Sequence, residues 1–96
     1  MSVTALVLDA RDNVATAVRP LESGVSAEVM AGDVSLKVLL RRDIPFGHKF
    51  ALRDIGRGED VIKYGEVIGR ATEPIGEGEH VHLHNVEGLR GRGDRR

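Results

Sequence analysis

The feature that most constrains the fold is a two-residue alternation of apolar and polar positions, which glycines interrupt at short intervals. Such alternation is typical of β-strands with one buried face, and it runs through residues 14–18, 25–29 and 34–38. Pro20, which has no amide donor, ends the first run. The link Met30-Ala31-Gly32-Asp33 between the other two predicts a hairpin. The pattern therefore predicts a mostly β fold of about six to eight short, bent strands.

One turn pattern recurs three times, as an isoleucine followed three positions later by a glycine. It occurs at residues 44–48, 55–59 and 75–79. A buried isoleucine followed by a glycine at positive φ would fix the chain at a sharp corner. The spacings between the corners differ, which excludes a solenoid. Residues 53–59 could alternatively hold one irregular or 3₁₀ turn, although the two glycines there oppose an α-helix.

Length and charge exclude several classes of protein. A chain of 96 residues forms one small domain that buries only about 60–65 % of its unfolded surface, so an active site enclosed on all sides is not expected. The net charge of −1 argues against a nucleic-acid partner. Without cysteine there is neither a disulfide framework nor a thiolate zinc site. No apolar run approaches the roughly 18 residues of a membrane span.

The chain ends suggest how it is organised. The first ten residues lack the basic region of a signal peptide, so a cytoplasmic protein without a membrane partner is the default expectation. The last residues are rich in glycine and arginine and have no apolar periodicity. We predict a single domain over residues 1–88 and a disordered basic tail over residues 89–96.

Side chains able to do acid–base or metal chemistry are concentrated between Asp43 and Asn85, which include all four histidines. The sharpest pattern is Glu79-His80-Val81-His82-Leu83-His84-Asn85. If it is extended, Val81 and Leu83 face the core, and the histidines share the other face about 6.5–7 Å apart. Imidazoles at alternate positions can converge on one Zn²⁺ or Fe²⁺ ion. The alternative is a solvated strand face, on which His80 in particular could simply be exposed.

Two glycine-flanked clusters offer further candidates, Gly47-His48-Lys49 and Lys63-Tyr64-Gly65. A glycine beside such side chains lets the backbone approach a ligand, and the cations could bind a carboxylate or phosphate. Lysine, tyrosine and histidine can also remove a proton next to a carboxylate. The alternative is two ordinary surface lysines and a half-buried tyrosine.

Three blocks of this chain together resemble the amino-terminal SAF domain of the altronate and galactarate dehydratases. They are D-I-P-x-G-H-K-F-A-L-x-D-I from Asp43, V-I-K-Y-G-x-x-I-G-x-A from Val61 and I-x-x-G-E-x-V-H-x-H-N from Ile75. With weaker matches upstream, the resemblance covers roughly residues 9–86. It implies a small SAF-type β-clip domain of short bent strands with tight glycine turns.

The resemblance also implies a function. In that family a larger carboxy-terminal domain carries most of the catalytic apparatus, and a divalent metal, commonly iron, is used. Because the chain ends soon after Asn85, we expect the small subunit of a two-chain sugar-acid dehydratase, inactive alone. Its partner would be a larger catalytic subunit that holds most of the Fe²⁺ ligands. A sulfolactate sulfo-lyase has a similar split, which leaves elimination of sulfite open.

Other readings compete with this one. The chain could be a non-catalytic SAF module that binds a sugar acid or assembles the large chain, or an unrelated small metal-binding protein. A homo-oligomer of the isolated chain is a further option.

The resemblance implies the following site residues: catalytic Lys49, Lys63 and Tyr64, substrate-binding Gly47, His48 and Asn85, and metal-binding His82 and His84. His82 and His84 should face the same concave surface as His48 and Lys49, with Lys63 and Tyr64 nearby. Replacing His82 by alanine should then lower turnover of the complex about tenfold or more. His80, which matches the family least, should tolerate alanine.

Overall fold

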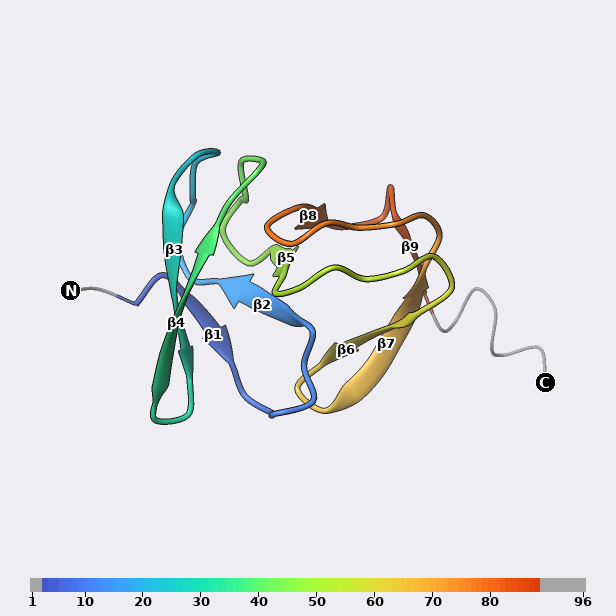
Figure 1. The fold of residues 1–96 in the computed structure, drawn as a ribbon, viewed down its shortest axis with the longest axis horizontal. Coiled ribbons are helices and arrows are strands. Elements are labelled where there is room, and N and C mark those ends of the chain that lie inside the picture. Colours follow the sequence, from blue (N-terminus) through green and yellow to red (C-terminus); the bar gives the residue numbers. More distant parts are fainter. Residues whose placement is uncertain (1–2, 89–96) are drawn as a thin grey trace.

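The computed structural model describes residues 3–88, and every regular element within them is a β-strand (Figure 1). The strands are β1 Ala5–Val7, β2 Val14–Ala17, β3 Ser26–Ala31, β4 Val34–Leu39, β5 Lys49–Ala51, β6 Asp60–Lys63, β7 Glu66–Ala71, β8 His80–Val81 and β9 Val86–Gly88. The predicted mostly β fold of short strands is confirmed. These described residues hold nine strands, more than the expected number, because segments as short as β8 pair with a neighbour.

The strands form two sheets that lie side by side along the long axis of the molecule (Figure 1). The first has the order β4-β3-β1-β2-β5-β8 and the second the order β6-β7-β9. Among these pairs only β1 and β3 are parallel. The predicted hairpin is confirmed as the β3–β4 connection, where Gly32 has a φ of 65°. No helix that could cross a membrane occurs in residues 3–88.

The three predicted isoleucine–glycine corners are all present. Ile44, Ile55 and Ile75 are buried, and the glycines that follow them have φ values between 82° and 85°. A fourth corner begins at Leu21 and ends with Gly24 at a φ of 88°. The sequence pattern missed it because leucine stands where the other corners have isoleucine. Arg57-Gly58 forms one of these turns, so the alternative of a 3₁₀ turn over residues 53–59 is wrong.

Each corner is a type II β-turn, which requires positive φ at its third residue. In every case the amide of the residue after the glycine donates to the carbonyl of the residue that follows the buried anchor, over 2.9–3.3 Å. The anchors pair two by two: Leu21 exchanges reciprocal backbone hydrogen bonds of 2.8 Å with Ile44, and Ile55 does so with Ile75. The four corners therefore brace the chain as two pairs.

Each pair of corners belongs to a different hydrophobic core. Leu21 and Ile44 pack in a core with Phe50, and Ile55 and Ile75 pack in a second core with Val61 and Val81. The strand β5 lies between the two cores. It sends Phe50 into the first and Ala51 into the second, because successive side chains of a strand point to opposite faces. β5 is therefore packed against a hydrophobic core on each of its faces.

The expected domain over residues 1–88 and tail over residues 89–96 stay predictions. The tail lies outside the described residues.

Candidate functional site

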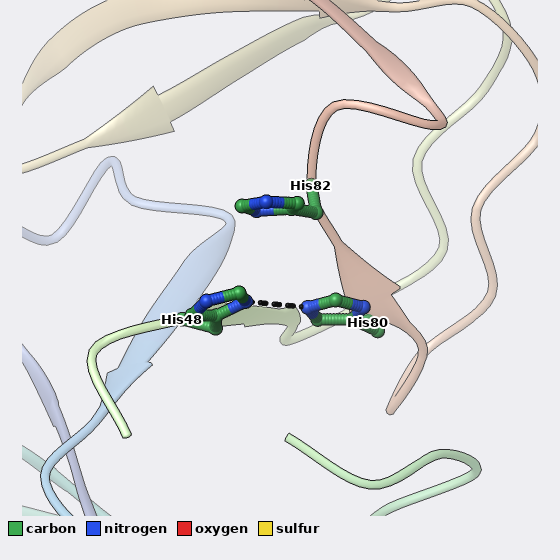
Figure 2. Close-up of side chains that lie close together, drawn as sticks. All are labelled: His48, His80 and His82. Carbon is green, nitrogen blue, oxygen red and sulfur yellow. Dashed lines mark hydrogen bonds between the residues drawn. The ribbon is translucent and has the colours of Figure 1, made fainter. Parts of the chain in front are cut away.

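The four histidines gather where β5 and β8 pair. His48 Nδ1 lies 2.9 Å from His80 Nε2. The ring of His82 stacks on that of His48, with centroids 4.3 Å apart and planes 18° from parallel (Figure 2). The ring of His84 lies 5.5 Å from that of His80. Segments 32 or more residues apart in the chain thus bring four imidazoles to one place.

Strand pairing explains why these histidines meet. In the antiparallel β5–β8 pair, Phe50 lies opposite His80 and Lys49 opposite Val81. His48 immediately precedes β5, and its carbonyl accepts a 2.9 Å hydrogen bond from the amide of Ala17. Because both segments are fixed by backbone hydrogen bonds, the imidazoles they carry are held at the same edge of the sheet.

The expected extended strand through His84 is wrong. β8 ends at Val81, and the chain then turns. Asn85, which is buried, accepts a hydrogen bond from the amide of His82 and donates one to the carbonyl of His80, both over 2.9 Å. An asparagine that bonds nearby backbone groups in this way competes with strand pairing. As a result Leu83 is 83 % exposed instead of facing the core.

The alternative in which His80 is simply exposed is also wrong, since this residue is partly buried. Its ring lies close to the rings of the other three histidines. Burial is the main cause that lowers the pKa of His80 from 6.5 to about 4, and the neighbouring His48, His82, His84 and Lys49 lower it further. The pKa of His82 is lowered for similar reasons, with burial first and His48 next. At neutral pH these two imidazoles are therefore uncharged, the form in which histidine binds metals or accepts protons.

This shift makes the stability of the metal-free protein depend on pH. The unfolded chain takes up a proton on His80 near pH 6.5, whereas the folded chain does so only near pH 4. The contribution of His80 to the free energy of unfolding is therefore fully present above pH 6.5, and it is lost as the pH falls towards 4. We expect a loss of about 1 kcal/mol over this window, after allowing for solvent screening of a partly exposed group.

Urea unfolding of EDTA-treated protein at pH 7 and pH 4.5 measures this loss, with His80→Gln as the comparison. The glutamine variant should lose less stability than the parent protein. The carboxyl of Asp9 has little influence on this comparison. Arg11 lowers its pKa to about 2, so its contribution to stability changes mainly at pH values below 4. Equal losses in both proteins would contradict the prediction.

Lys49 lies beside the histidines and is half-buried. Burial lowers its pKa, and the positive charge of Lys63 lowers it further. Lys63 Nζ lies 4.8 Å from the centre of the Tyr64 ring. The three predicted catalytic residues are therefore near one another. Their catalytic roles stay predictions.

Tyr64 has an uncommon backbone conformation for a side chain of its size. It has a φ of 55° and, with Gly65 at 78°, forms the two-residue turn between β6 and β7. Two successive positive φ values define a type I′ turn, in which glycine and asparagine are preferred. Such strain, about 1–2 kcal/mol, is found most often at functional sites.

The structure gives Gly47 and Asn85, both predicted to bind substrate, structural partners. The amide of Gly47 donates to the carbonyl of Ala17 over 2.9 Å, and the side chain of Asn85 closes the turn described above. A substrate contact by either residue stays a prediction.

Two hollows flank the histidines. The larger, of about 780 Å³, is lined by charged and polar residues that include Arg41, Arg42, Glu79, His80 and His84. The smaller, of about 190 Å³, is mainly apolar, with Lys49 and His82 at its wall. The histidines therefore stand between a polar hollow and an apolar one.

Sequence reasoning missed the two arginines of the larger hollow. Arg41 Nη1 and Arg42 Nε lie 4.0 and 3.5 Å from the two carboxylate oxygens of Glu79. Guanidinium groups in such a hollow suit a carboxylate or sulfonate ligand. The available signal was their position directly before the Asp43-Ile44 corner, which fixes the direction of the chain there.

The side chains also show which histidines could hold a metal ion. Ring nitrogens of His48, His80 and His82 all lie within 4.8 Å of one another. Two nitrogens bound to one tetrahedral Zn²⁺ ion at 2.0–2.1 Å are about 3.4 Å apart. The distances here are close to that value, and the stacked rings would have to rotate so that their nitrogens point at the ion. The donor set of three imidazoles fits Zn²⁺ or Fe²⁺. This donor set differs from the predicted pair, His82 and His84. It contains His82 together with His48 and His80, and it does not contain His84.

Comparison with known proteins gives consistent matches. The family described as the altronate/galactarate dehydratase SAF domain matches residues 3–89. The α subunit of (2R)-sulfolactate sulfo-lyase from Chromohalobacter salexigens is 43 % identical over 90 residues, which are 91 % of this chain and 96 % of that subunit. Altronate dehydratase from Escherichia coli is 47 % identical over 79 residues, 82 % of this chain but only 15 % of that enzyme. The enzyme of the same name from Bacillus subtilis is 40 % identical over 77 residues, again 15 % of its length.

Proposed function

Because this chain belongs to the altronate/galactarate dehydratase SAF-domain family, we propose that it is the small subunit of a two-chain lyase. In this proposal it completes an active site on a larger catalytic subunit. The observation that carries the proposal is the gathering of His48, Lys49, His80 and His82 at one edge of the sheet. His80 lines a hollow that contains two arginines, and Lys49 and His82 line a second hollow. The match to 96 % of a sulfo-lyase α subunit supports the separate-subunit arrangement.

The proposed reaction is a β-elimination from a 2-hydroxy carboxylic acid. A base removes the proton from the carbon that bears the 2-hydroxyl group. The electron pair of that bond forms the double bond to carbon 3, and the group on carbon 3 leaves with its bonding pair. The resulting enol then takes up a proton on carbon 3, loses the proton of its 2-hydroxyl group and becomes a 2-oxo acid. Sulfite can leave with its bonding pair directly, whereas a hydroxyl group takes up a proton from an acid and leaves as water.

Each cluster on this chain has a role in that reaction. Lys49 is the proposed base, because its lowered pKa increases the fraction of neutral amine at physiological pH. Arg41 and Arg42 bind the substrate carboxylate or sulfonate from the larger hollow. A divalent metal ion, Fe²⁺ in this proposal, would stabilise the negative charge that develops on the substrate as its proton is removed. Ligands from this chain would be His48, His80 and His82, with the remainder from the larger subunit.

The leaving group separates two versions of the proposal. Sulfite is favoured by the relative that this chain matches over nearly the whole length, a (2R)-sulfolactate sulfo-lyase subunit. Water, the first expectation from the sequence, is favoured by the higher identity to altronate dehydratase from Escherichia coli. The substrate is therefore proposed as a class, a 2-hydroxy acid with a leaving group on carbon 3.

Reconstitution tests the proposal. The purified chain is expected to convert none of sulfolactate, altronate or galactarate, because it supplies only part of the catalytic groups. Addition of a larger lyase subunit encoded beside it should produce turnover of one of them. Formation of 2-oxo acid measures turnover, and release of sulfite distinguishes the two versions. Robust conversion by the 96-residue chain alone, or none by the reassembled pair, would overturn the proposal.

A further inference from the structure

We propose that His48, His80 and His82 form a site for one first-row divalent metal ion that this chain binds without a partner. This inference deepens the proposed function, which gives these three histidines to a metal ion shared with a larger subunit, by assigning stable binding to this chain alone. It does not depend on lyase activity, because it rests only on the three side chains and on the backbone that holds them.

The backbone of all three residues is fixed by hydrogen bonds. The amide of His48 donates to the carbonyl of Pro45 over 3.0 Å and closes the corner at Gly47. His80 is paired with Phe50 of β5, whose side chain is fully buried. The amide of His82 donates to the side chain of Asn85 over 2.9 Å. Little main-chain order must therefore be created on metal binding, which favours affinity.

Ring nitrogens of the three side chains lie close together. His48 Nδ1 and His80 Nε2 are 2.9 Å apart, and one ring nitrogen from each of the three residues lies within 4.8 Å of the other two. Figure 2 shows the rings of His48 and His80 side by side and the ring of His82 over them. Metal binding would rotate the His82 ring out of its stack on His48, so that its nitrogen points at the ion, and would move the His48 and His80 nitrogens about 0.5 Å further apart.

The charges near the site fit a metal ion with an exchangeable ligand. Three neutral imidazoles leave the ion with its full positive charge, and the nearby carboxylate of Glu79 is already shared between Arg41 and Arg42. Three protein ligands leave one tetrahedral position for water or an anion, the arrangement typical of catalytic zinc sites. The larger hollow, which His80 lines, gives an anion access to that side.

His84 provides a matched control. It comes from the same turn as His82 and its ring lies 5.5 Å from that of His80, but it is exposed and is not among the three converging nitrogens. A site made by the three named histidines should not need it. Binding by any histidine on the surface would depend on His84 as much as on the others.

The test is a titration of the EDTA-treated full chain with Co²⁺, followed by its visible absorption, and with Zn²⁺, followed by calorimetry. We expect one ion per chain and the intense Co²⁺ bands of four-coordinate geometry. His48→Ala, His80→Ala and His82→Ala should each weaken Zn²⁺ binding by at least about tenfold, while His84→Ala binds like the parent chain.

Far-UV circular dichroism checks that each variant is folded. The glutamine variant of the same histidine, which keeps more of the side-chain volume, replaces any alanine variant that does not fold. Absence of stoichiometric binding would overturn the inference. So would losses in His84→Ala equal to those in the other three variants. Since neither substrate nor partner chain is present, failure here is distinct from failure of the proposed lyase function.

Discussion

A Gly78→Ala variant is expected to lose most of the stability of this fold. Gly78 has a φ of 85°, a conformation that costs an L-residue about 1–2 kcal/mol. A β-carbon there would also overlap the carbonyl oxygen of Leu39, which is backbone and cannot rotate away. Backbone hydrogen bonds of 2.9 Å tie Gly78 to Ala51 and to Arg41, so relief of the overlap breaks further contacts. The combined cost should exceed about 3 kcal/mol, a large part of the stability of a small domain.

Gly58→Ala is the matched control. Gly58 occupies the same position of an equivalent corner, with a φ of 84°, but a β-carbon there would have no atom within 4 Å. Only the conformational cost of about 1–2 kcal/mol should remain. Urea unfolding of both variants separates the two contributions. Similar losses in both would show that the close approach of Leu39 is not what requires glycine at position 78.

A Lys49→Met variant of the reassembled lyase is expected to lower kcat by about 100-fold or more, the contribution of a positioned general base. Methionine keeps most of the apolar stem of the side chain, which lines the smaller hollow with Val81 and Ile68, and removes only the amine. The limb of the pH–kcat profile in which activity rises with deprotonation of Lys49 should disappear as well. A change in folding alone would not remove that limb.

Lys37→Met serves as the control for lysine removal. Lys37 lies on β4 and its amine is 3.6 Å from Glu28 at an exposed surface, away from the histidines. Its replacement should leave kcat within about twofold of the value for the parent enzyme. Lys37 is away from the proposed site, and the loss of an exposed ion pair changes the stability of the fold little. A Lys49→Met enzyme that keeps its full kcat would exclude Lys49 as the base. His82, which lines the same hollow, would then be the next candidate for the base.

Features that depend on a few neighbouring residues could be predicted from the sequence. The three isoleucine–glycine corners are an example, since the third residue of a type II turn requires a positive φ, which glycine adopts without strain. The β3–β4 hairpin is another. The fourth corner was not predicted because its buried anchor is Leu21 and not an isoleucine. A pattern based on isoleucine alone does not show that any large apolar residue that can be buried is sufficient there.

Features that depend on distant residues could not be predicted in this way. The alternation of histidines from His80 to His84 favoured a strand, but two side-chain hydrogen bonds of Asn85 turn the chain instead. His80 could not be placed at the centre of the site before its pairing with β5 was known. The contact of Arg41 and Arg42 with Glu79 spans more than thirty residues of chain. Each outcome depends on strand order, which local periodicity does not determine.

The four corners also determine where this protein can change. In each corner the residue just before the glycine is exposed to solvent, whatever its chemistry: Ser23, Phe46, Arg57 and Glu77. The anchor and the glycine alone satisfy the turn, so these four positions can diverge in evolution, or be exchanged in the laboratory, without disturbing either core. One of them, Phe46, is two residues from His48. A position near the histidines can thus be exchanged while the scaffold that carries them stays constant.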